Sequence, residues 1–350
     1  MDDSTTIKAV ETGQSDVTAA ERAVIDRSAR IQASLHPGDQ IVQLKTRTSM
    51  AGHWTDLFSF VTGSIREKDL AYLILSDDAA SAQKIPSAGI VQWEPEGWGD
   101  GGQVPWRVAG TAIATQPLEQ LCVVGEFGEV LMLGSGDRHE ERIGKGKNAP
   151  KDRGPLRGVR AIGSHTYCVG MDRQAYRREA PGKWVSLTSG IPAVDEDEVV
   201  GFEAVDGFAE SEIYACGWDG EIWQCDGANW IERNSPVNTV LVDLCCGDDG
   251  HVYACGRNGV LVRGRGDLWE VVDLAGFSED LWSLAWYKGK LYVATMDHVL
   301  TLDAGGLKPI NMGNDRASTC YDLVLGSGML WSVGAKDVMS FDGKNWSRID

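Results

Sequence analysis

One short segment recurs along the second half of the chain at a constant interval. Its four copies are Tyr214–Gly217, Tyr253–Gly256, Tyr292–Thr295 and Trp331–Gly334, and each copy begins 39 residues after the one before it. Fixed periods near 40 residues are typical of propellers and solenoids, in which every repeat is one supersecondary unit. The chain is therefore expected to be a repeat protein.

Residues 240–274 show what one repeat contains. Four short apolar segments are separated by turn sequences, among them Gly247–Gly250 and Arg257–Gly259. The Asn-Gly pair in the second turn is a strong hairpin signal, and four antiparallel strands make one propeller blade. The same frame fits residues 199–233, 281–310 and 321–349, and at looser spacing it extends upstream to segments that end at Gly170 and Gly125.

The repeat predicts an all-β fold, a seven-bladed β-propeller over residues 50–350. A first, divergent blade is placed on Trp54–Val61, Leu70–Leu75, Gly89–Trp93 and Trp106–Val108. Six blades are the alternative if residues 50–110 do something else. Residues 1–49 are expected to form an N-terminal extension with one helix at about 18–34, because Thr18–Glu21 reads as a capping box. That helix either packs on the ring or docks a partner.

Several turns place an aspartate and a glycine shortly before a tryptophan, most clearly Asp226–Trp230 and Asp342–Trp346. The segment Ser340–Trp346 resembles an Asp-box, although it is one residue short and lacks the threonine. The repeats thus resemble the Asp-box and YVTN-type, WD40-like propellers over about residues 50–350. The resemblance implies a fold only, because the Asp-box is structural in those families and propellers host many functions.

Composition limits the classes of function. The chain carries 33 Lys and Arg against 51 Asp and Glu, a formal net charge of −18, which argues against general binding to nucleic acid or anionic membranes. The sequence shows neither a signal peptide nor a transmembrane segment. Its eight cysteines include no Cys-x-x-Cys pair, so a zinc site is not expected. Reduced thiols in a cytoplasm are the simplest interpretation.

Residues that carry chemistry are hard to find. The six histidines have no metal-ligand spacing and no hydrolase or nucleotide-binding motif is present, so neither an enzyme, a cofactor nor a metal is expected. Asp172, Asp219, Asn258 and Asp297 recur at corresponding turns between second and third strands, a position that suits Asp and Asn. The alternative is a propeller hydrolase or lyase in which Asp172, Asp219 and Asp297 ring the central channel and hold a divalent metal.

Charge is unevenly distributed along the chain. Residues 138–183 contain twelve basic and five acidic side chains, a local charge of +7, so the rest of the chain carries −25. Much of this stretch is a long connection, Gly134–Pro155, between the second and third blades, and such loops are often functional. A further alternative is therefore polyanion or nucleic-acid binding through the 138–183 basic patch, chiefly its loop at 138–160.

In a propeller, the connections between blades and the turns between second and third strands share one rim. Trp, Met and Arg are enriched in interface cores, and the acidic run 195–198 falls on the same rim as the basic loop. The favoured hypothesis is a non-enzymatic interaction module that binds a protein partner, as an immunity or inhibitor protein or as a subunit of a larger bacterial assembly. The residues expected to contact the partner are Trp218, Met171, Arg173, Arg257, Met296, Lys145, Lys147, Lys151 and Arg153.

Overall fold

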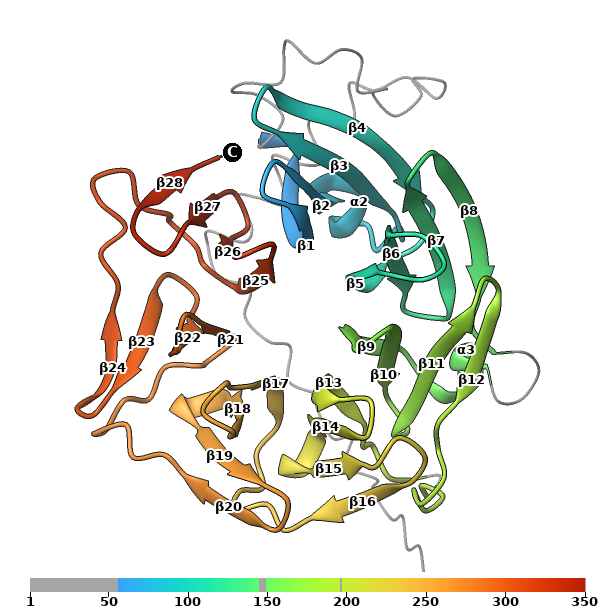
Figure 1. Ribbon diagram of the computed structural model, residues 1–350, viewed down its shortest axis with the longest axis vertical. Coiled ribbons are helices and arrows are strands. Elements are labelled where there is room, and N and C mark those ends of the chain that lie inside the picture. Colours follow the sequence, from blue (N-terminus) through green and yellow to red (C-terminus); the bar gives the residue numbers. More distant parts are fainter. Residues whose placement is uncertain (1–55, 145–148, 196, 350) are drawn as a thin grey trace, which may run out of the picture.

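The computed structural model describes residues 56–144, 149–195 and 197–349. Within these residues, 28 strands form seven four-stranded antiparallel sheets, each made of four consecutive strands. The sheets stand as blades around a central channel (Figure 1). The seven-bladed, all-β prediction is confirmed, and the six-bladed alternative is wrong. The N-terminal extension at 1–49 and its helix at 18–34 lie outside the described residues.

The first three blades run from residue 58 to residue 186, innermost strand first. Blade 1 contains β1 (Phe58–Glu67), β2 (Leu70–Asp77), β3 (Ala88–Glu94) and β4 (Gly97–Val104). Blade 2 contains β5 (Val108–Ala114), β6 (Gln120–Gly125), β7 (Glu129–Gly134) and β8 (Asp137–Arg142). Blade 3 contains β9 (Leu156–Ile162), β10 (His165–Gly170), β11 (Gln174–Ala180) and β12 (Lys183–Ser186).

The last four blades contain the regular 39-residue repeat. Blade 4 contains β13 (Phe202–Ala209), β14 (Glu212–Gly217), β15 (Ile222–Cys225) and β16 (Trp230–Arg233). Blade 5 contains β17 (Leu241–Cys246), β18 (Val252–Gly256), β19 (Leu261–Arg265) and β20 (Leu268–Val271). Blade 6 contains β21 (Ser283–Tyr287), β22 (Lys290–Ala294), β23 (Val299–Asp303) and β24 (Gly306–Pro309). Blade 7 contains β25 (Asp322–Gly326), β26 (Met329–Val333), β27 (Val338–Phe341) and β28 (Trp346–Arg348).

Blade 1 differs from the prediction at both edges. Its innermost strand lies at 58–67 rather than 54–61, and its outermost strand is the glycine-rich segment 97–104 rather than 106–108. Val108 instead begins the innermost strand of blade 2. The glycines resemble a turn in the sequence, but they allow close strand contact: a Cβ on Gly101 would lie 2.8 Å from Ile90 Cγ2. The register between β3 and β4 shifts at this point, between Ile90 and Val91.

The recurring quartets are confirmed as second strands or their ends. Cys168, Cys216 and Cys255 lie on these strands and are buried, as a small apolar side chain at a repeated packing position should be. Cys245 and Cys246 point to opposite faces of β17, because they pack in two different hydrophobic clusters. All eight cysteines are unpaired.

The two Asp-box-like turns are also structural, as the resemblance implied. The carboxylate of Asp226 accepts hydrogen bonds from the backbone N–H groups of Ala228 and Asn229 at 2.9 and 2.7 Å. Asp342 does the same for Lys344 and Asn345 at 2.7 and 2.8 Å. Each aspartate thereby fixes the turn that leads from the third strand into the fourth.

The core is divided among the blade interfaces. The buried apolar side chains of the described residues fall into seven clusters, and each cluster combines residues from two neighbouring blades. Blades 3 and 4, for example, pack through Ile162, Tyr167, Phe202 and Trp223. Burial of this apolar surface is what holds the blades in a ring.

The ring closes between blades 7 and 1 without exchange of a described strand, since each blade is complete in itself. This closing interface, called the seam below, has an apolar cluster that includes Phe60, Leu73 and Trp331. Polar contacts reinforce it. Thr62 Oγ1 donates to Asp322 Oδ2 at 2.7 Å, and Lys336 Nζ donates to Asp78 Oδ2 at 2.6 Å.

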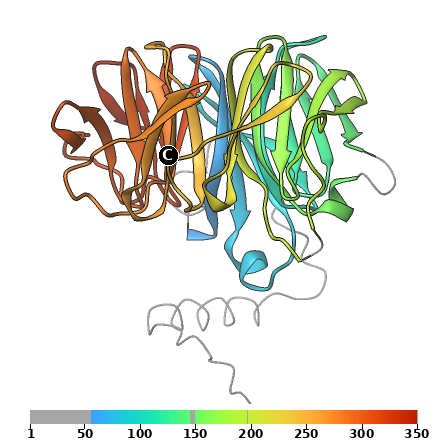
Figure 2. The same cartoon turned by 90° about the horizontal axis from the view of Figure 1, so that it is seen from below.

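One edge of the ring gathers the turns between second and third strands together with the connections between blades, and we call it the connection rim. Two short helices belong to it: α2 (Asp78–Ala82), which joins β2 to β3, and α3 (Pro150–Arg153), which joins blade 2 to blade 3. Both helices lie along the lower edge of the ring in Figure 2. None of the helices in the described parts of the chain is long and apolar enough to cross a membrane.

Candidate functional site

The connection rim is continuous across blades 2, 3 and 4. Gly201, in the connection that enters blade 4, forms a β-bridge with Met171 and accepts a hydrogen bond from the backbone N–H of Trp218 at 3.0 Å. Met171 in turn donates its backbone N–H to Pro155 at 3.0 Å, beside α3. The structure thus brings together three regions that the sequence had assigned to one docking surface.

Trp218 is half-buried on this rim. It begins the short turn helix η3 (Trp218–Gly220), and its indole Nε1 donates to Glu203 Oε1 at 2.6 Å. The hydrogen bond fixes the orientation of the ring while part of the side chain stays accessible. A large side chain already held in place loses little conformational freedom on binding.

The other predicted contacts fall into two groups. Arg257, Lys151 and Met296 are exposed on the connection rim, as a contact residue requires. Arg153 and Arg173 are committed to the protein itself. Arg153 Nε donates to Asp172 Oδ2 at 2.5 Å. Arg173 Nε donates to Glu221 Oε2 at 2.7 Å, and only 12% of the Arg173 side chain is exposed. Lys145 and Lys147 lie outside the described residues.

Sequence reasoning missed the exposed apolar residues of the connection rim. Ten large apolar side chains are exposed in the described residues, and five of them lie on this rim. Four of the five had not been singled out, because isolated apolar residues in loops carry no periodicity. All five belong to the turns and connections of blades 1, 2, 4 and 6 and are therefore spread around the rim. The five are Leu57, Ile85, Phe127, Val199 and Met296.

In the described residues of the basic run at 138–183, which leave out Lys145 and Lys147, most of the arginines form ion pairs within the protein. These arginines point to different parts of the ring, and each of seven forms an ion pair with a carboxylate. Arg178 on β11, for example, pairs with Glu141 on β8, and both side chains are almost completely buried. The seven paired arginines are Arg142, Arg153, Arg157, Arg160, Arg173, Arg177 and Arg178.

The aspartates that were considered as channel ligands do not line the channel. Asp172, Asp219 and Asn258 have positive φ angles of 57°, 54° and 57°, a conformation that Asp and Asn tolerate in tight turns. They and Asp297 lie on the connection rim. The interpretation of these residues as turn formers is therefore supported, and their placement around the channel is wrong.

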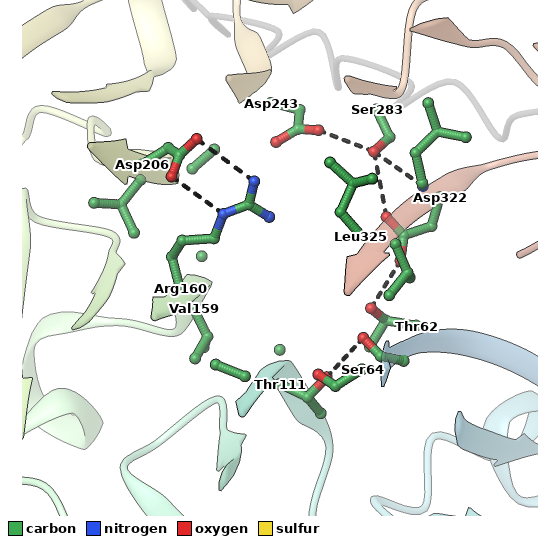
Figure 3. Close-up of a pocket in the computed structure, with 18 of the residues that line it drawn as sticks. Thr62, Ser64, Thr111, Val159, Arg160, Asp206, Asp243, Ser283, Asp322 and Leu325 are labelled. Atoms are coloured by element: carbon green, nitrogen blue, oxygen red, sulfur yellow. Dashed lines mark hydrogen bonds and ion pairs between the residues drawn. The ribbon is translucent and has the colours of Figure 1, made fainter. Parts of the chain in front are cut away.

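The channel is lined instead by the innermost strands, around a cavity of about 670 Å³. Its charged groups are Arg157 and Arg160 on β9, Glu203 and Asp206 on β13, Asp243 on β17 and Asp322 on β25, of which Figure 3 labels Arg160 and the three aspartates. Arg160 Nε donates to Asp206 Oδ1 at 3.2 Å. Ser283 Oγ donates to Asp243 Oδ2 at 2.9 Å and lies 3.3 Å from Asp322 Oδ1.

Most of these channel side chains also join one blade to the next. Asp206 Oδ2 accepts the backbone N–H of Cys246 at 2.9 Å, and Asp243 Oδ2 accepts that of Leu284 at 2.7 Å. Burial raises the pKa of Asp243 to about 6, and the neighbouring Asp322 carboxylate adds to the effect. The channel carboxylates therefore connect the blades, at an electrostatic cost.

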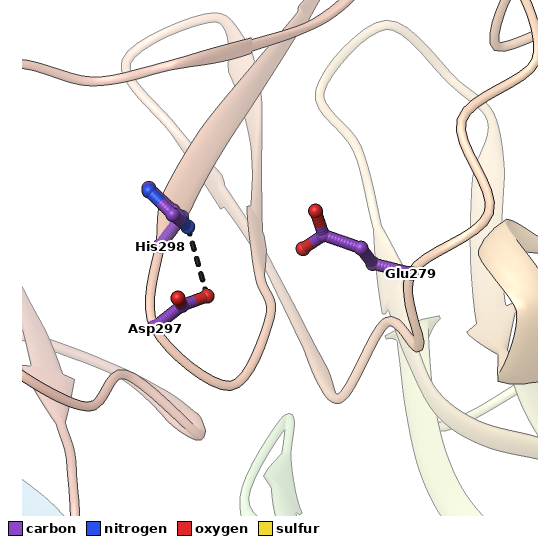
Figure 4. Close-up of side chains that lie close together, drawn as sticks. All are labelled: Glu279, Asp297 and His298. Carbon is purple, nitrogen blue, oxygen red and sulfur yellow. Dashed lines mark hydrogen bonds and ion pairs between the residues drawn. The ribbon is translucent and has the colours of Figure 1, made fainter.

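One group on the connection rim has the donor types of a metal site. The ligand atoms of Glu279, Asp297 and His298 lie within 4.8 Å of one another (Figure 4). His298 Nδ1 is 2.8 Å from Asp297 Oδ1, and 43% and 57% of these side chains are exposed. This group could not be recognised in the sequence. Glu279 belongs to the connection before blade 6, whereas Asp297 and His298 belong to a turn within blade 6. Exposed acidic groups of this kind are common on protein surfaces.

Comparison with solved structures places the fold. The WD40 propeller domain of Doa1 matches with a TM-score of 0.58 at 13% identity, over 83% of this chain and 92% of that one. YCF48 from Cyanidioschyzon merolae matches with a TM-score of 0.58 at 14% identity, over 81% and 95%. The protein is thus a WD40-like, seven-bladed β-propeller.

Sequence comparison is more specific. No family model matches the chain. It is 44% identical over 299 residues to the immune protein Tsi7 of Pseudomonas aeruginosa, which covers 84% of this chain and 98% of that protein. The chain belongs to the family of the immune protein Tsi7.

Proposed function

We propose that this protein is an immunity protein that binds a protein toxin through its connection rim and neutralises it without catalysis. The observation that carries the proposal is the 44% identity to the immune protein Tsi7 over 98% of that protein's length. A similarity that extends over almost the whole relative covers the loops of the rim as well as the strands.

The rim supplies what such a function needs. It combines the oriented Trp218 with exposed apolar residues such as Met296 and Phe127, and aromatic and Met side chains are enriched where binding energy concentrates. The blades beneath it are fixed by seven apolar clusters, so the loops are presented on a rigid base.

The proposal extends to the cellular location. All eight cysteines are unpaired and seven are buried, which supports a reducing compartment, since disulfides form in oxidising ones. We therefore place the protein in the cytoplasm, where it meets the toxin before the toxin reaches its target.

The first experiment is affinity purification of the tagged protein from its native cells, with mass spectrometry of the co-purifying proteins. A candidate toxin is then expressed in a bacterial host in which it arrests growth. Co-expression of the wild-type protein is expected to restore growth. The double variant Trp218→Ala with Met296→Lys is expected to protect poorly.

A matched control keeps this test specific. Leu268 is 81% exposed on the outer strand β20, away from the connection rim, so Leu268→Lys adds the same charge elsewhere and should protect fully. If the rim variant neutralises a toxin as well as the wild type does, the proposed surface is contradicted. Failure to capture or resist any toxin would contradict the function.

A further inference from the structure

A cavity on the connection rim has an unusual charge arrangement. It lies where the β10–β11 turn, the β14–β15 turn and the connection from blade 4 to blade 5 meet, and it has a volume of about 490 Å³. Four of its side chains are acidic and two are basic, so its charged lining sums to −2. We call it the acidic pocket, and its charged residues are Arg173, Glu198, Asp219, Glu221, Glu232 and Arg233.

Glu221 gives the pocket a carboxylate that is only half satisfied. Its side chain is 6% exposed. Oε2 accepts hydrogen bonds from Arg173 Nε at 2.7 Å and from Trp223 Nε1 at 2.6 Å. Oε1 is buried and has no hydrogen-bond partner among the described residues. Because buried polar atoms are nearly always paired, an unpaired carboxylate oxygen beside a cavity needs an explanation.

The two arginines do not neutralise the pocket. Arg233 directs its guanidinium elsewhere, donating to Gln224 at 3.0 Å and to Asp267 at 2.5 Å, and neither of these residues lines the pocket. Arg173 is held against Glu221, and its Nη2 lies 3.6 Å from Glu198. Asp219 and Glu232 are exposed and have no ion pair among the described residues.

The position of the pocket links it to the docking surface. Asp219 and Gly220 belong to the same three-residue turn that Trp218 begins, so the pocket and the indole are parts of one surface. A protein partner that inserts a cationic side chain into the pocket would therefore lie beside Trp218.

We infer that the acidic pocket receives an arginine or lysine side chain of the toxin, bound by the exposed carboxylates of Glu232 and Asp219 beside the buried carboxylate of Glu221. This inference rests on the proposed function and names the chemistry of its partner. A cation fits because the lining is negative and one oxygen of the buried Glu221 carboxylate has no donor. Ion pairing at such a pocket favours one partner over others and speeds association.

The first test needs no toxin. Arginine amide is titrated into the protein at constant ionic strength, and the ¹H–¹⁵N signal of the Trp223 indole, identified by its loss in Trp223→Phe, reports on the Glu221 carboxylate. We expect a saturable shift with arginine amide and none with citrulline amide, an analogue whose side chain carries a neutral urea group in place of the guanidinium. Lysine amide shows whether an ammonium also binds. No saturable shift, or an equal response to citrulline amide, overturns the inference.

Variants locate the effect. Glu232→Gln is expected to weaken arginine amide binding at least threefold, because it removes an exposed carboxylate of the pocket while leaving the hydrogen bonds of Glu221 in place. The matched control is Glu270→Gln, on the outer strand β20 and paired with Arg263, which should leave binding unchanged. Equal affinities of the two variants would overturn the assignment.

The second test uses the captured toxin. We expect the double variant Asp219→Asn with Glu232→Gln to bind it at least tenfold more weakly than the wild type does. We also expect the effect to disappear when the matching Arg or Lys of the toxin is replaced. A toxin that binds wild type and variant equally overturns the pocket assignment but leaves the immunity function intact. A protein that binds arginine amide and no toxin overturns the proposed function and the assigned occupant together.

Discussion

The central channel and the connection rim both contain aspartates and glutamates, but these groups meet different partners. In the channel, Asp206 and Asp243 accept backbone hydrogen bonds from the next blade. In the acidic pocket of the rim, Asp219 and Glu232 face solvent and Glu221 keeps one buried oxygen unpaired. The channel carboxylates thus accept hydrogen bonds from their own chain, whereas carboxylates of the rim remain available to another molecule.

This difference separates stability from binding. A channel carboxylate should matter for how firmly the blades hold together, and a rim carboxylate for what the protein recognises. An enzyme built on the channel would need carboxylates free to act on a substrate, and the connections between blades leave little such freedom. The following substitutions test the separation, from the largest expected effect to the smallest.

The largest effect is expected at Glu141, a buried carboxylate whose two oxygens both accept hydrogen bonds from other side chains of the protein. Glu141 accepts two donors of Arg178, Nε at 3.0 Å and Nη2 at 2.6 Å, and the Trp184 indole at 2.9 Å. Arg178→Ala leaves this carboxylate buried without its arginine partner, so we expect the free energy of unfolding to fall by about 3–5 kcal/mol. Urea unfolding followed by circular dichroism measures it.

The control for this prediction replaces the ion pair as a whole. The double variant Arg178→Met with Glu141→Leu should recover most of the loss, because no buried charge is left without a partner. If the single variant loses less than about 1 kcal/mol of unfolding free energy, water reaches the ion pair. The proposed difference between buried carboxylates and rim carboxylates would then be smaller than expected.

The second test concerns the cost of charge in the channel. The pKa of Asp243 is raised to about 6 in the folded protein, against roughly 3.9 in an unfolded chain. Between these values the folded state holds a proton that the unfolded state has lost, so this group makes stability fall as pH rises from about 4 to 6. Asp243→Asn removes that cost and should stabilise the protein above pH 6 by up to about 3 kcal/mol.

The measurement is the difference in unfolding free energy between variant and wild type from pH 4 to pH 8. The difference should vanish near pH 4, where the wild-type carboxyl is largely protonated in the folded state. A difference that does not change with pH would mean that Asp243 is as well solvated as a surface aspartate.

The third test moves to the rim. Trp218→Ala should weaken toxin binding about 30-fold, or about 2 kcal/mol, which is the range of an interface hot spot. Trp218→Phe keeps most of the ring but loses the hydrogen bond to Glu203, and so separates contact from orientation. Calorimetric titration of the toxin gives both affinities. An unchanged affinity in Trp218→Ala would move the docking surface away from η3.

The smallest effect is expected from an arginine in the same basic run as Arg178. Arg142 pairs with Glu129 at 2.9 Å, and 46% of its side chain is exposed. Arg142→Ala should lower the free energy of unfolding by less than about 1 kcal/mol, because exposed ion pairs contribute little. The same urea unfolding experiment measures it, and a loss as large as that of Arg178→Ala would show that exposure does not decide the contribution.

The sequence predicted the blades correctly where the repeat is regular. The prediction of strand positions was wrong where glycines belong to a strand and not to a turn. Blades 4 to 7 follow the 39-residue period, so their second strands could be placed directly. In blade 1, the glycines near Gly101 allow β4 to approach Ile90, a contact that composition does not distinguish from a turn.

The site was predicted in outline only. Trp218, Met171 and Met296 were placed on the connection rim from topology alone. The partners of Arg153 and Arg173 were not predictable, because Asp172 and Glu221 lie 19 and 48 residues away along the chain. The acidic pocket was missed for the same reason, since its carboxylates come from the connection into blade 4, the β14–β15 turn and strand β16. One available signal was Glu221, a lone acidic residue directly before the apolar strand β15.

The seam also decides how the molecule comes apart under load. Phe58 and Arg348 are the first and last strand residues of the ring, and the blades that carry them touch through side chains and scattered hydrogen bonds, with no shared strand between them. An unfoldase that pulls on either end therefore strains this one interface first. The ring is expected to open into an arc of intact blades before any single sheet is unravelled.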